Sequence, residues 1–384
     1  RNVPTGACPT MKTKAAVVYE LGAKRPYATS LPMKIEEVDL DPPQANEVLV
    51  KVAAAGVCHS DLSVVAGVRE RPLPMVLGHE ASGVVQEVGP GVEGLEVGDH
   101  VVFAFLPSCG QCLPCKEGRP SICEKGAAAN GAGTLMGGGM RLHKDGQKLY
   151  HQAGVSCFSE YVVAHRSSVV KIDKDLPLDI ACTFSCAVIT GVGAVLNTAK
   201  VPAGASVGVV GLGGTGLAAV MGAKMAGARH IVGIDALDDK LEWGKKLGCD
   251  TVFNALDNDV VEKVRDATGG GLEYMFECVG RVEAMDLAYK VTKRGGTTTS
   301  SGLSHPATNM TVQHVNLVTE ERTIKGSYLG SCIPERDIPH YIEMYKRGAL
   351  PVDKLICEKI PLDDINAAFD HLAEGHTVRQ VITF

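Results

Sequence analysis

The stretch Val207-Gly-Val-Val-Gly211-Leu-Gly213-Gly214-Thr-Gly216 decides the fold of this chain. It places the pattern Gly-x-Gly-x-x-Gly between a buried apolar run and an Ala/Gly-rich helical segment. Gly211 permits a tight turn, Gly213 lets a pyrophosphate approach the backbone, and Gly216 allows the helix to pack closely on the strand. The pattern therefore predicts a dinucleotide site, with the phosphates at the helix N-terminus.

The segments around this unit alternate between helix patterns and strand patterns. Helix patterns cover Val188–Ala199 and Leu212–Ala226, and strand patterns cover Ser206–Val210, His230–Ile234, Tyr274–Glu277 and Thr297–Ser300. Strands that alternate with helices indicate a doubly wound parallel sheet with right-handed crossovers. The predicted fold class for this part of the chain is therefore α/β.

Asp235 is a further residue that indicates a dinucleotide site. It ends the second strand, nineteen residues beyond Gly216, where a carboxylate binds the ribose 2′-hydroxyl of a dinucleotide. Because a carboxylate repels a 2′-phosphate, Asp235 favours NAD over NADP. Lys240, five residues further on, is a candidate ribose or adenosine contact, and a solvated lysine is the alternative.

The residues from Lys14 to about Val170 have a different pattern. Short alternating apolar runs separated by Gly and Pro predict a β-rich domain with many turns. Gly126–Gly154 is Gly-rich and weakly patterned, so we expect a long surface loop there. The remaining expectations are a loose extension over residues 1–10, helices near Ile338–Arg347 and Asp363–Ala373, and a final strand, Gln380–Phe384, that returns to the β-rich domain.

Four cysteines, Cys109, Cys112, Cys115 and Cys123, form the unit Cys-x2-Cys-x2-Cys-x7-Cys. Thiolates this close together on a turning backbone are typical of a closed, tetrahedral structural zinc site. Buried or disulfide-bonded cysteines are the alternative. Disulfides would imply a secreted chain, and no cleavable apolar leader opens this sequence.

The composition and the net charge limit the classes of binding partner that we expect. The chain has 384 residues, 13 cysteines and a formal net charge of −6, with no long Lys/Arg run. Nucleic acid and an anionic membrane surface are therefore unexpected partners, and no apolar run approaches the roughly 18 residues of a membrane span. The length predicts two domains, and the cysteine content predicts thiolate–metal chemistry in a reducing cytoplasm.

A second set of metal ligands is spread along the chain. Cys58 lies in Gly56-Val-Cys-His-Ser-Asp61, His79 precedes Glu80, and Cys186 follows Phe184-Ser. Two thiolates, one imidazole and an open fourth position would make a catalytic zinc site. From the residues alone, Cys182 competes with Cys186 as the third ligand.

With these motifs in this order, the chain resembles the zinc-dependent medium-chain alcohol dehydrogenases from about Lys14 to Phe384. The resemblance implies a GroES-like catalytic domain over residues 1–187, with the zinc lobe at about 107–125. It also implies a Rossmann NAD-binding domain over 188–328 and a return to the catalytic domain over 329–384. The implied reaction is reversible hydride transfer between NAD and an alcohol or aldehyde, with one catalytic and one structural Zn²⁺ per chain.

The resemblance also assigns roles to individual residues. It places the catalytic zinc on Cys58, His79 and Cys186, and it favours Cys186 over Cys182. The other implied roles are these: Asp61 orients His79, Glu80 lies behind the metal, Ser60 accepts the substrate proton, Thr190 lies beside the nicotinamide, His59 and Arg379 contact the pyrophosphate, and Phe105 forms an aromatic wall of the substrate pocket.

The sequence departs from the family pattern near the pocket. Ser63 stands where many relatives end the proton relay with a histidine, so we expect an altered relay. His59 replaces an arginine of some members, which predicts looser pyrophosphate binding. Small residues at Ala128 and Ala153 predict a roomy pocket for medium-chain or aromatic primary alcohols.

Two other functions remain open on the sequence. One subgroup oxidises glutathione–formaldehyde adducts with an acidic residue near the pocket entrance and an arginine after the fourth lobe cysteine; this chain has Arg69 and Gly126-Ala-Ala-Ala there. A non-catalytic binding protein on the same scaffold would tend to lose the zinc ligands, which are all present. The length of the 126–154 segment matches dimeric relatives and predicts a homodimer.

Overall fold

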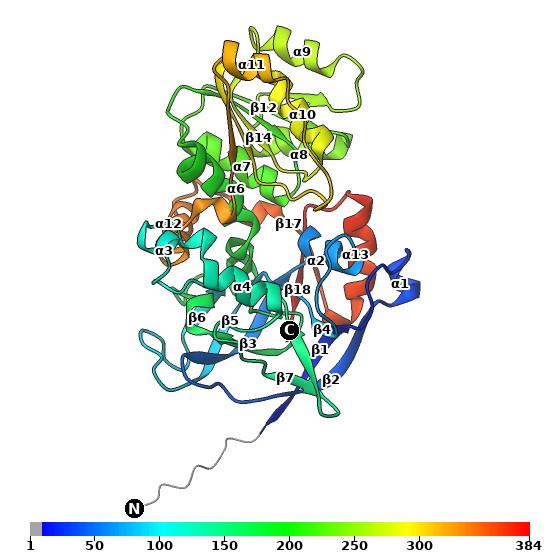
Figure 1. The fold of residues 1–384 in the computed structure, drawn as a ribbon, viewed down its shortest axis with the longest axis vertical. Coiled ribbons are helices and arrows are strands. Elements are labelled where there is room, and N and C mark those ends of the chain that lie inside the picture. The colour runs from blue at the N-terminus through cyan, green and yellow to red at the C-terminus, as the bar shows by residue number, and fades with distance from the viewer. Residues whose placement is uncertain (1–9) are drawn as a thin grey trace, which may run out of the picture.

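The computed structural model describes residues 10–384. Apart from Thr10, the predicted extension over residues 1–10 lies outside this range, as does Cys8. Two domains are stacked along the long axis of the molecule, and the first and last parts of the described chain meet in the same lower domain (Figure 1). The middle of the sequence builds the upper domain.

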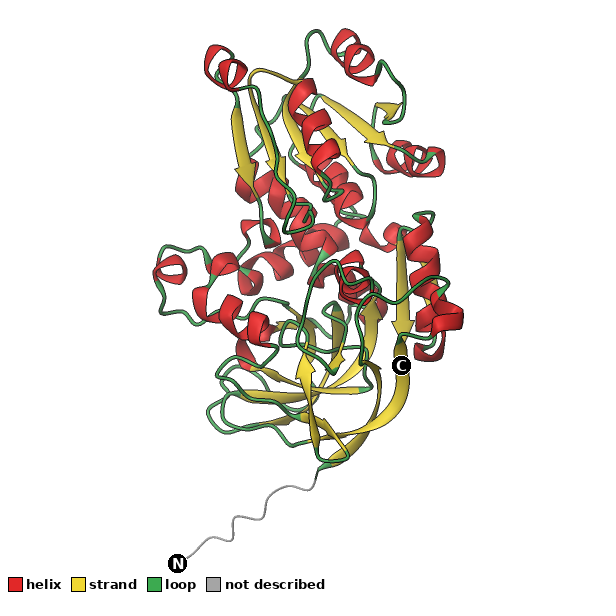
Figure 2. Ribbon diagram, turned by 45° about the vertical axis from the view of Figure 1, so that its right-hand side comes forward, coloured by secondary structure: helices red, strands yellow, loops and turns green. Residues whose placement is uncertain are grey.

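The upper domain contains a parallel sheet in the order β13-β12-β11-β14-β15-β16. Helices cover both faces of this sheet (Figure 2). The order reverses direction between β11 and β14, and in such sheets the ligand binds outside the carboxyl ends of the strands at that point. The strands are β11 (Ser206–Val210), β12 (His230–Asp235), β13 (Thr251–Asn254), β14 (Leu272–Glu277), β15 (Thr292–Ser300) and β16 (Thr323–Gly326); the helices are α7 (Gly214–Met225), α8 (Asp238–Leu247), α9 (Val260–Ala267), α10 (Val282–Val291) and α11 (His314–Thr319).

The central strand explains why this sequence adopts a parallel sheet. All five residues of β11, Ser206–Val210, are buried, and a strand covered by helices on both faces needs a continuous apolar run. The following helix α7 is also buried over most of its length, so its small residues let it lie close to the sheet. The predicted α/β class and doubly wound sheet are confirmed.

The lower domain combines a closed barrel, β1-β2-β7-β8-β4, with a sheet in the order β10-β6-β5-β3-β18-β17, to which β9 is added by pairing with β3. Strand β18 pairs antiparallel with β3, with Val381 opposite Gly56, which confirms the predicted return of the chain. The strands are β1 (Met11–Val18), β2 (Met33–Leu40), β3 (Glu47–Gly56), β4 (Met75–Val76), β5 (Ala81–Val88), β6 (His100–Phe103), β7 (Leu142–Lys144), β8 (Gln147–His151), β9 (Tyr161–His165), β10 (Val169–Ile172), β17 (Ile356–Ile360) and β18 (Arg379–Thr383).

Helices of this domain lie between its strands and beside the upper domain. They include several short segments that the all-β expectation did not contain. Their bounds are α1 (Tyr27–Ser30), α2 (His59–Val65), α3 (Leu113–Lys116), α4 (Glu124–Ala132), α5 (Leu178–Ala181), α6 (Ala187–Gly193), α12 (Pro334–Lys346) and α13 (Ile365–Glu374).

The expectation of a long loop over Gly126–Gly154 is wrong. Helix α4 begins after Cys123, whose sulfur accepts a hydrogen bond from the Gly126 amide, and it ends at Gly133 with a positive φ of 68°. The hairpin of β7 and β8 then follows, and its turn residues Asp145 and Gly146 both have positive φ. Asp-Gly is a strong hairpin signal, so the sequence contained evidence for this element.

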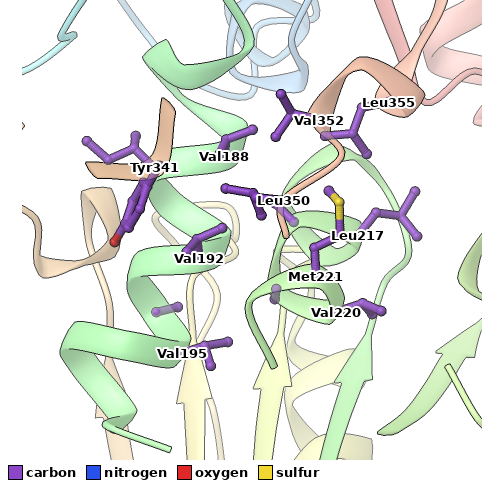
Figure 3. Packing of buried hydrophobic residues seen from close by; sticks show 14 of the residues in the cluster. Val188, Val192, Val195, Leu217, Val220, Met221, Tyr341, Leu350, Val352 and Leu355 are labelled. Carbon is purple, nitrogen blue, oxygen red and sulfur yellow. The ribbon is translucent and has the colours of Figure 1, made fainter. Parts of the chain in front are cut away.

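One buried cluster joins the two domains. Side chains of α6 and the π-helical turn that follows it, Ala194–Ala199, pack against α7 and against residues near Leu350 (Figure 3). Val188, Val192 and Val195 lie on one side of this cluster, and Leu217 and Met221 face them from α7. Across residues 10–384, no single helix has the length and apolarity to cross a membrane, although the bent pair Leu178–Ser185 and Ala187–Ala199 meets both requirements together.

Candidate active site and structural metal site

Three side chains from separate elements meet at the boundary between the domains. Cys58 precedes α2 in an extended conformation, His79 lies in the short connection between β4 and β5, and Cys186 precedes α6. Their ligand atoms, together with a carboxylate oxygen of Glu80, all lie within 4.8 Å of one another. The structure therefore brings together the three residues assigned to the catalytic zinc.

Cys182 takes a different position. Its thiol donates a hydrogen bond to the Asp179 carbonyl at 3.1 Å, and its side chain packs with Ala54 and Val381. It does not belong to the cluster of ligand atoms around Cys186. The geometry thus separates the two cysteines that the sequence left in competition.

Asp61 fixes the orientation of the His79 ring. The His79 Nδ1 and Asp61 Oδ1 atoms are 3.0 Å apart, and both side chains are buried. A carboxylate on this side holds the proton on Nδ1 and leaves the lone pair of Nε2 free, which is the usual support of a zinc-bound histidine. His79 Nε2 is buried without a hydrogen-bond partner, and it lies in the cluster with Cys58 and Cys186.

Cys58 has a lowered thiol pKa, as a metal ligand requires, in addition to its position in the cluster. A hydrogen bond from Cys186 and the neighbouring charge of His79 together keep the pKa of the Cys58 thiol well below its usual value, despite its burial. Two sulfurs and one orphaned imidazole nitrogen form a donor set that suits Zn²⁺, with a position left for substrate. The residues present therefore fit a catalytic zinc.

Glu80 and Arg379 form a buried ion pair directly behind this cluster. Arg379 Nη1 lies 2.9 Å from Glu80 Oε1 and also donates to the Val57 carbonyl at 3.0 Å. Both side chains are almost fully buried. The guanidinium of Arg379 also lies against the glycine turn, since a Cβ added at Gly214 would meet its Nη2 atom at 2.6 Å. Arg379 thus joins the metal cluster to the dinucleotide turn.

The glycine turn has the geometry that its sequence predicts. Gly211 has a φ of +91°, and a Cβ at Gly216 would lie 1.7 Å from the Gly211 carbonyl oxygen, so neither position tolerates a side chain. A Cβ at Gly213 would meet nothing within 4 Å, which leaves open space beside the N-terminus of α7. No side chain caps this helix, so its amide groups remain available for a phosphate.

Asp235 and Lys240 lie next to this turn. Asp235 accepts hydrogen bonds from the Leu212 amide at 2.6 Å and the Leu237 amide at 3.1 Å, so it stands at the end of β12 facing the turn. Lys240 is buried and donates to the Thr377 carbonyl, so the alternative of a solvated lysine is wrong. Its aliphatic stem is packed, and its ammonium group joins α8 to the segment before β18.

A cavity of about 330 Å³ opens over the metal cluster. Besides the zinc ligands Cys58, His79 and Cys186, the predicted residues His59, Ser60, Phe105 and Thr190 line it, and so does Ala153. Ala128 is exposed and does not line this cavity, so the expectation that it borders the substrate channel is wrong. It is an exposed residue of α4, within the segment predicted to be a loop.

Several lining residues were not predicted. The ring of Phe105 meets His79 edge-on, with 5.6 Å between centroids, and it contacts Tyr328 in the same manner at 5.9 Å. Val279 and Gly280, just after β14, also line the cavity. The latter two were predictable, because the carboxyl end of a strand beside the sheet's reversal point borders the ligand. The sequence contains no corresponding indication that Tyr328 borders the ligand.

The four lobe cysteines form a second cluster. Their sulfur atoms all lie within 4.8 Å of one another. Amide hydrogen bonds from Gln111 and Cys112 lower the pKa of Cys109 to about 6, whereas burial and the neighbouring sulfurs of Cys112 and Cys123 raise the pKa of Cys115 to about 12. Four adjacent thiolates repel one another unless a cation binds them, so this donor set fits a closed structural zinc site.

The lobe depends on this metal because it buries little apolar surface. Leu113 is 66% exposed and Ile122 is 38% exposed.

We expect Cys112→Ala to lower the zinc content from two ions per chain to one and to open the lobe to trypsin after Lys116 or Lys125. Zinc analysis and mass spectrometry of the tryptic fragments measure both effects. Cys357→Ala, at an exposed cysteine of β17, is the control, and an uncut lobe in Cys112→Ala would contradict the expectation.

A dinucleotide-binding sheet and a metal centre of two thiolates and one imidazole, which face each other across one cavity, define a zinc-binding dehydrogenase. Comparison with known proteins refines this class. The family described as "Alcohol dehydrogenase GroES-like domain" matches residues 44–174, and the family described as "Zinc-binding dehydrogenase" matches residues 214–347.

Full-length relatives agree with these matches. The chain is 40% identical over 379 residues to the class-3 alcohol dehydrogenase of Drosophila melanogaster, covering 97% of each chain. It is 38% identical to the S-(hydroxymethyl)glutathione dehydrogenase of Synechocystis, covering 97% of this chain and 100% of the relative. The crystal structure of benzyl alcohol dehydrogenase from Acinetobacter calcoaceticus has a TM-score of 0.91 and 32% identity, over 97% and 99% of the two chains. The chain belongs to the zinc-dependent medium-chain alcohol dehydrogenase family.

Proposed function

We propose that this protein oxidises primary alcohols, including aromatic and medium-chain ones, with NAD and reduces the corresponding aldehydes with NADH. The observation that carries the proposal is the convergence of Cys58, His79 and Cys186 at the base of the cavity that Thr190 and Val279 also line. The names of the relatives support an alcohol as substrate, and the benzyl alcohol dehydrogenase supports an aromatic one.

Different residues of the chain have different roles in this reaction. Cys58, His79 and Cys186 would hold a zinc ion, which would supply a Lewis acid that lowers the pKa of an alcohol and polarises an aldehyde. Ser60 borders the same cavity and offers a hydroxyl for the alcohol proton. Phe105 and Tyr328 exclude water beside the reacting carbon, and Thr190 holds the nicotinamide side of the cavity, so that the two reactants are kept close together.

Ser63 does not replace the missing relay histidine. Its hydroxyl donates to the His59 carbonyl at 2.8 Å, within the first turns of α2. A group that relays a proton must accept one and donate one, and the donor hydrogen of Ser63 is already used. We therefore propose that the proton passes from Ser60 to His59 or to solvent in the cavity.

The function is tested with the purified protein, its zinc content and a panel of alcohols and aldehydes followed by NADH absorbance. Two zinc ions per chain and turnover of benzyl alcohol or 1-hexanol support the proposal. S-(hydroxymethyl)glutathione belongs in the same panel, because a relative bears that name. Turnover of the glutathione adduct alone would replace the proposal, and binding of NADH without turnover of any alcohol or aldehyde would contradict it.

The preference for NAD rests on the charge of Asp235. Because the Asp235 carboxylate faces the turn that receives the dinucleotide, we expect Asp235→Asn to raise the ratio of kcat/KM for NADP to that for NAD by about 10- to 100-fold. The amide keeps an acceptor for the Leu212 amide but loses the charge that repels a 2′-phosphate. Asp238→Asn, an exposed neighbour, is the control. An unchanged ratio in Asp235→Asn would contradict this account of cofactor choice.

We also propose a homodimer in the cytoplasm. Strand β16 is an edge of the upper sheet, and α11 beside it exposes Val315 and Val318, which are 53% and 61% accessible. An edge strand with exposed apolar neighbours favours pairing with a second copy. Light scattering after size-exclusion chromatography measures the mass, and a monomer at micromolar concentration would contradict the dimer. The thiolates of both metal sites need a reducing compartment.

A further inference from the structure

Two arginines line the active-site cavity. Arg69 and Arg71 lie just after α2, and both border the cavity that contains Cys58, Cys186 and Phe105. Each is partly buried. Glu70, between them in the sequence, is exposed and does not border the cavity. Both arginines therefore border the space in which a substrate must lie.

Neither arginine has an acidic partner in the described part of the chain. Across residues 10–384, no carboxylate oxygen lies within 4.0 Å of either guanidinium, and neither guanidinium donates a hydrogen bond to the protein. Among residues 10–384, no Asp or Glu lines the cavity. Other buried or half-buried arginines of this protein do have such partners, as Arg141 with Glu47 and Arg379 with Glu80 show.

The two charges also act on each other. The pKa of Arg69 is lowered, first by burial and then by the nearby charge of Arg71. Two partly buried cations that repel each other cost folding free energy unless an anion compensates them. The described residues supply no such anion, so an anionic molecule that enters the cavity would compensate the two charges.

The charges near Arg69 differ from those near His59, the residue predicted to contact the pyrophosphate: Arg71 and Tyr328 lie near Arg69, whereas Arg379 and Lys240 lie near His59. Burial raises the pKa of Tyr328 most, the charge of Cys186 raises it further, and the charges of His79, Arg69 and Arg71 lower it. Tyr328 thus lies within electrostatic range of the arginine pair and of the metal cluster. A substrate that reaches the metal with one end can reach the arginines with the other.

We propose that Arg69 and Arg71 form an anion subsite that selects alcohols and aldehydes carrying a carboxylate at the end remote from the reacting carbon. Paired guanidinium groups suit a carboxylate because each presents two parallel N–H donors to its two oxygens. The proposal rests on the proposed function, since it assigns the substrate class of the same site. It does not alter the chemistry at the reacting carbon.

The test compares two substrates of the same shape, 4-(hydroxymethyl)benzoate and 4-methylbenzyl alcohol, which differ in a carboxylate or a methyl group at the remote end. In the wild-type protein we expect a higher kcat/KM for the carboxylate. In Arg69→Gln/Arg71→Gln we expect the ratio of the two kcat/KM values to fall by about 10- to 100-fold, mainly through KM. Arg69→Lys/Arg71→Lys keeps the charges and is expected to recover part of the ratio.

The matched control removes the same charge elsewhere. Arg229 and Arg347 are exposed and lie outside the cavity lining, so Arg229→Gln/Arg347→Gln is expected to keep the wild-type ratio. An equal fall in this control would show a general charge effect and overturn the subsite. A wild-type ratio in the Arg69/Arg71 variant would overturn it as well. The subsite would also be overturned if Arg69→Gln/Arg71→Gln changed the protein from a dimer to a monomer and left the ratio of the two kcat/KM values unchanged. The arginines would then contact a second subunit.

A binding measurement separates this proposal from the proposed function. Isothermal titration of the NADH-bound protein with 4-(hydroxymethyl)benzoate reports on the subsite even if no alcohol is turned over. Binding that is lost in Arg69→Gln/Arg71→Gln supports the subsite, and binding that persists overturns it. S-(hydroxymethyl)glutathione, measured in parallel, shows whether the carboxylate belongs to a compact hydroxy acid or to a peptide.

Discussion

Replacing Cys186 with serine is expected to lower kcat for an alcohol by at least about 1,000-fold and to reduce the zinc content from two ions per chain to one. The Lewis acid supplies several kcal/mol of transition-state stabilisation, and each 1.36 kcal/mol corresponds to a factor of ten in rate. A serine hydroxyl is a poor zinc ligand, so of the three residues assigned to the metal only Cys58 and His79 would remain. Zinc analysis by mass spectrometry and steady-state kinetics measure the two effects.

The control for this variant is Cys182→Ser. Cys182 is also buried, four residues away, but its thiol donates to the Asp179 carbonyl, which a serine hydroxyl can also do. We expect this variant to keep both zinc ions and most of its activity. If Cys186→Ser kept two zinc ions and full turnover, or if Cys182→Ser lost a zinc ion, the assignment of the metal centre would be wrong.

Replacing Arg379 with methionine is expected to lower the free energy of unfolding by about 3–5 kcal/mol, because it leaves the buried carboxylate of Glu80 without its partner. The same change removes the guanidinium that lies against Gly214, so we also expect weaker NADH binding. Urea unfolding at fixed zinc concentration and NADH fluorescence titration measure these two effects.

A second variant shows whether the lost ion pair causes the instability. In Arg379→Met/Glu80→Gln both charges are gone, so part of the lost stability is expected to return. Lys245→Met, which breaks an exposed ion pair with Glu242, is the control and is expected to leave the urea midpoint nearly unchanged. If Arg379→Met matched this control, the buried pair would not be a major source of stability.

The sequence contained most of the dinucleotide half of the site. The glycines of the turn and Asp235 can be predicted because their roles depend on local geometry, namely a positive φ, a close helix–strand contact and a position at a strand end. The predicted strand Ser206–Val210 and β11 have the same bounds. Local periodicity is enough for such a strand, since every residue in it is buried.

The parts that the residues alone did not predict depend on contacts across the fold. Spacing could not choose between Cys182 and Cys186, because the choice depends on which thiol lies near His79 once the catalytic domain has folded. The buried pair of Glu80 and Arg379 joins residues 299 positions apart. The helix α4 was missed because its Gly/Ala-rich sequence has almost no amphipathic pattern, and the Asp145-Gly146 hairpin because its strands are very short.

The pairing of β18 with β3 affects how the chain folds while the ribosome synthesises it. Strand β3 is synthesised early, yet its neighbour β18 emerges only after the whole dinucleotide-binding domain has been translated. Because domains generally fold as units during synthesis, the upper domain can acquire its structure first, while the lower one waits with an unpaired strand edge. Nascent chains of this protein are therefore most in need of chaperones just before translation of their final strand.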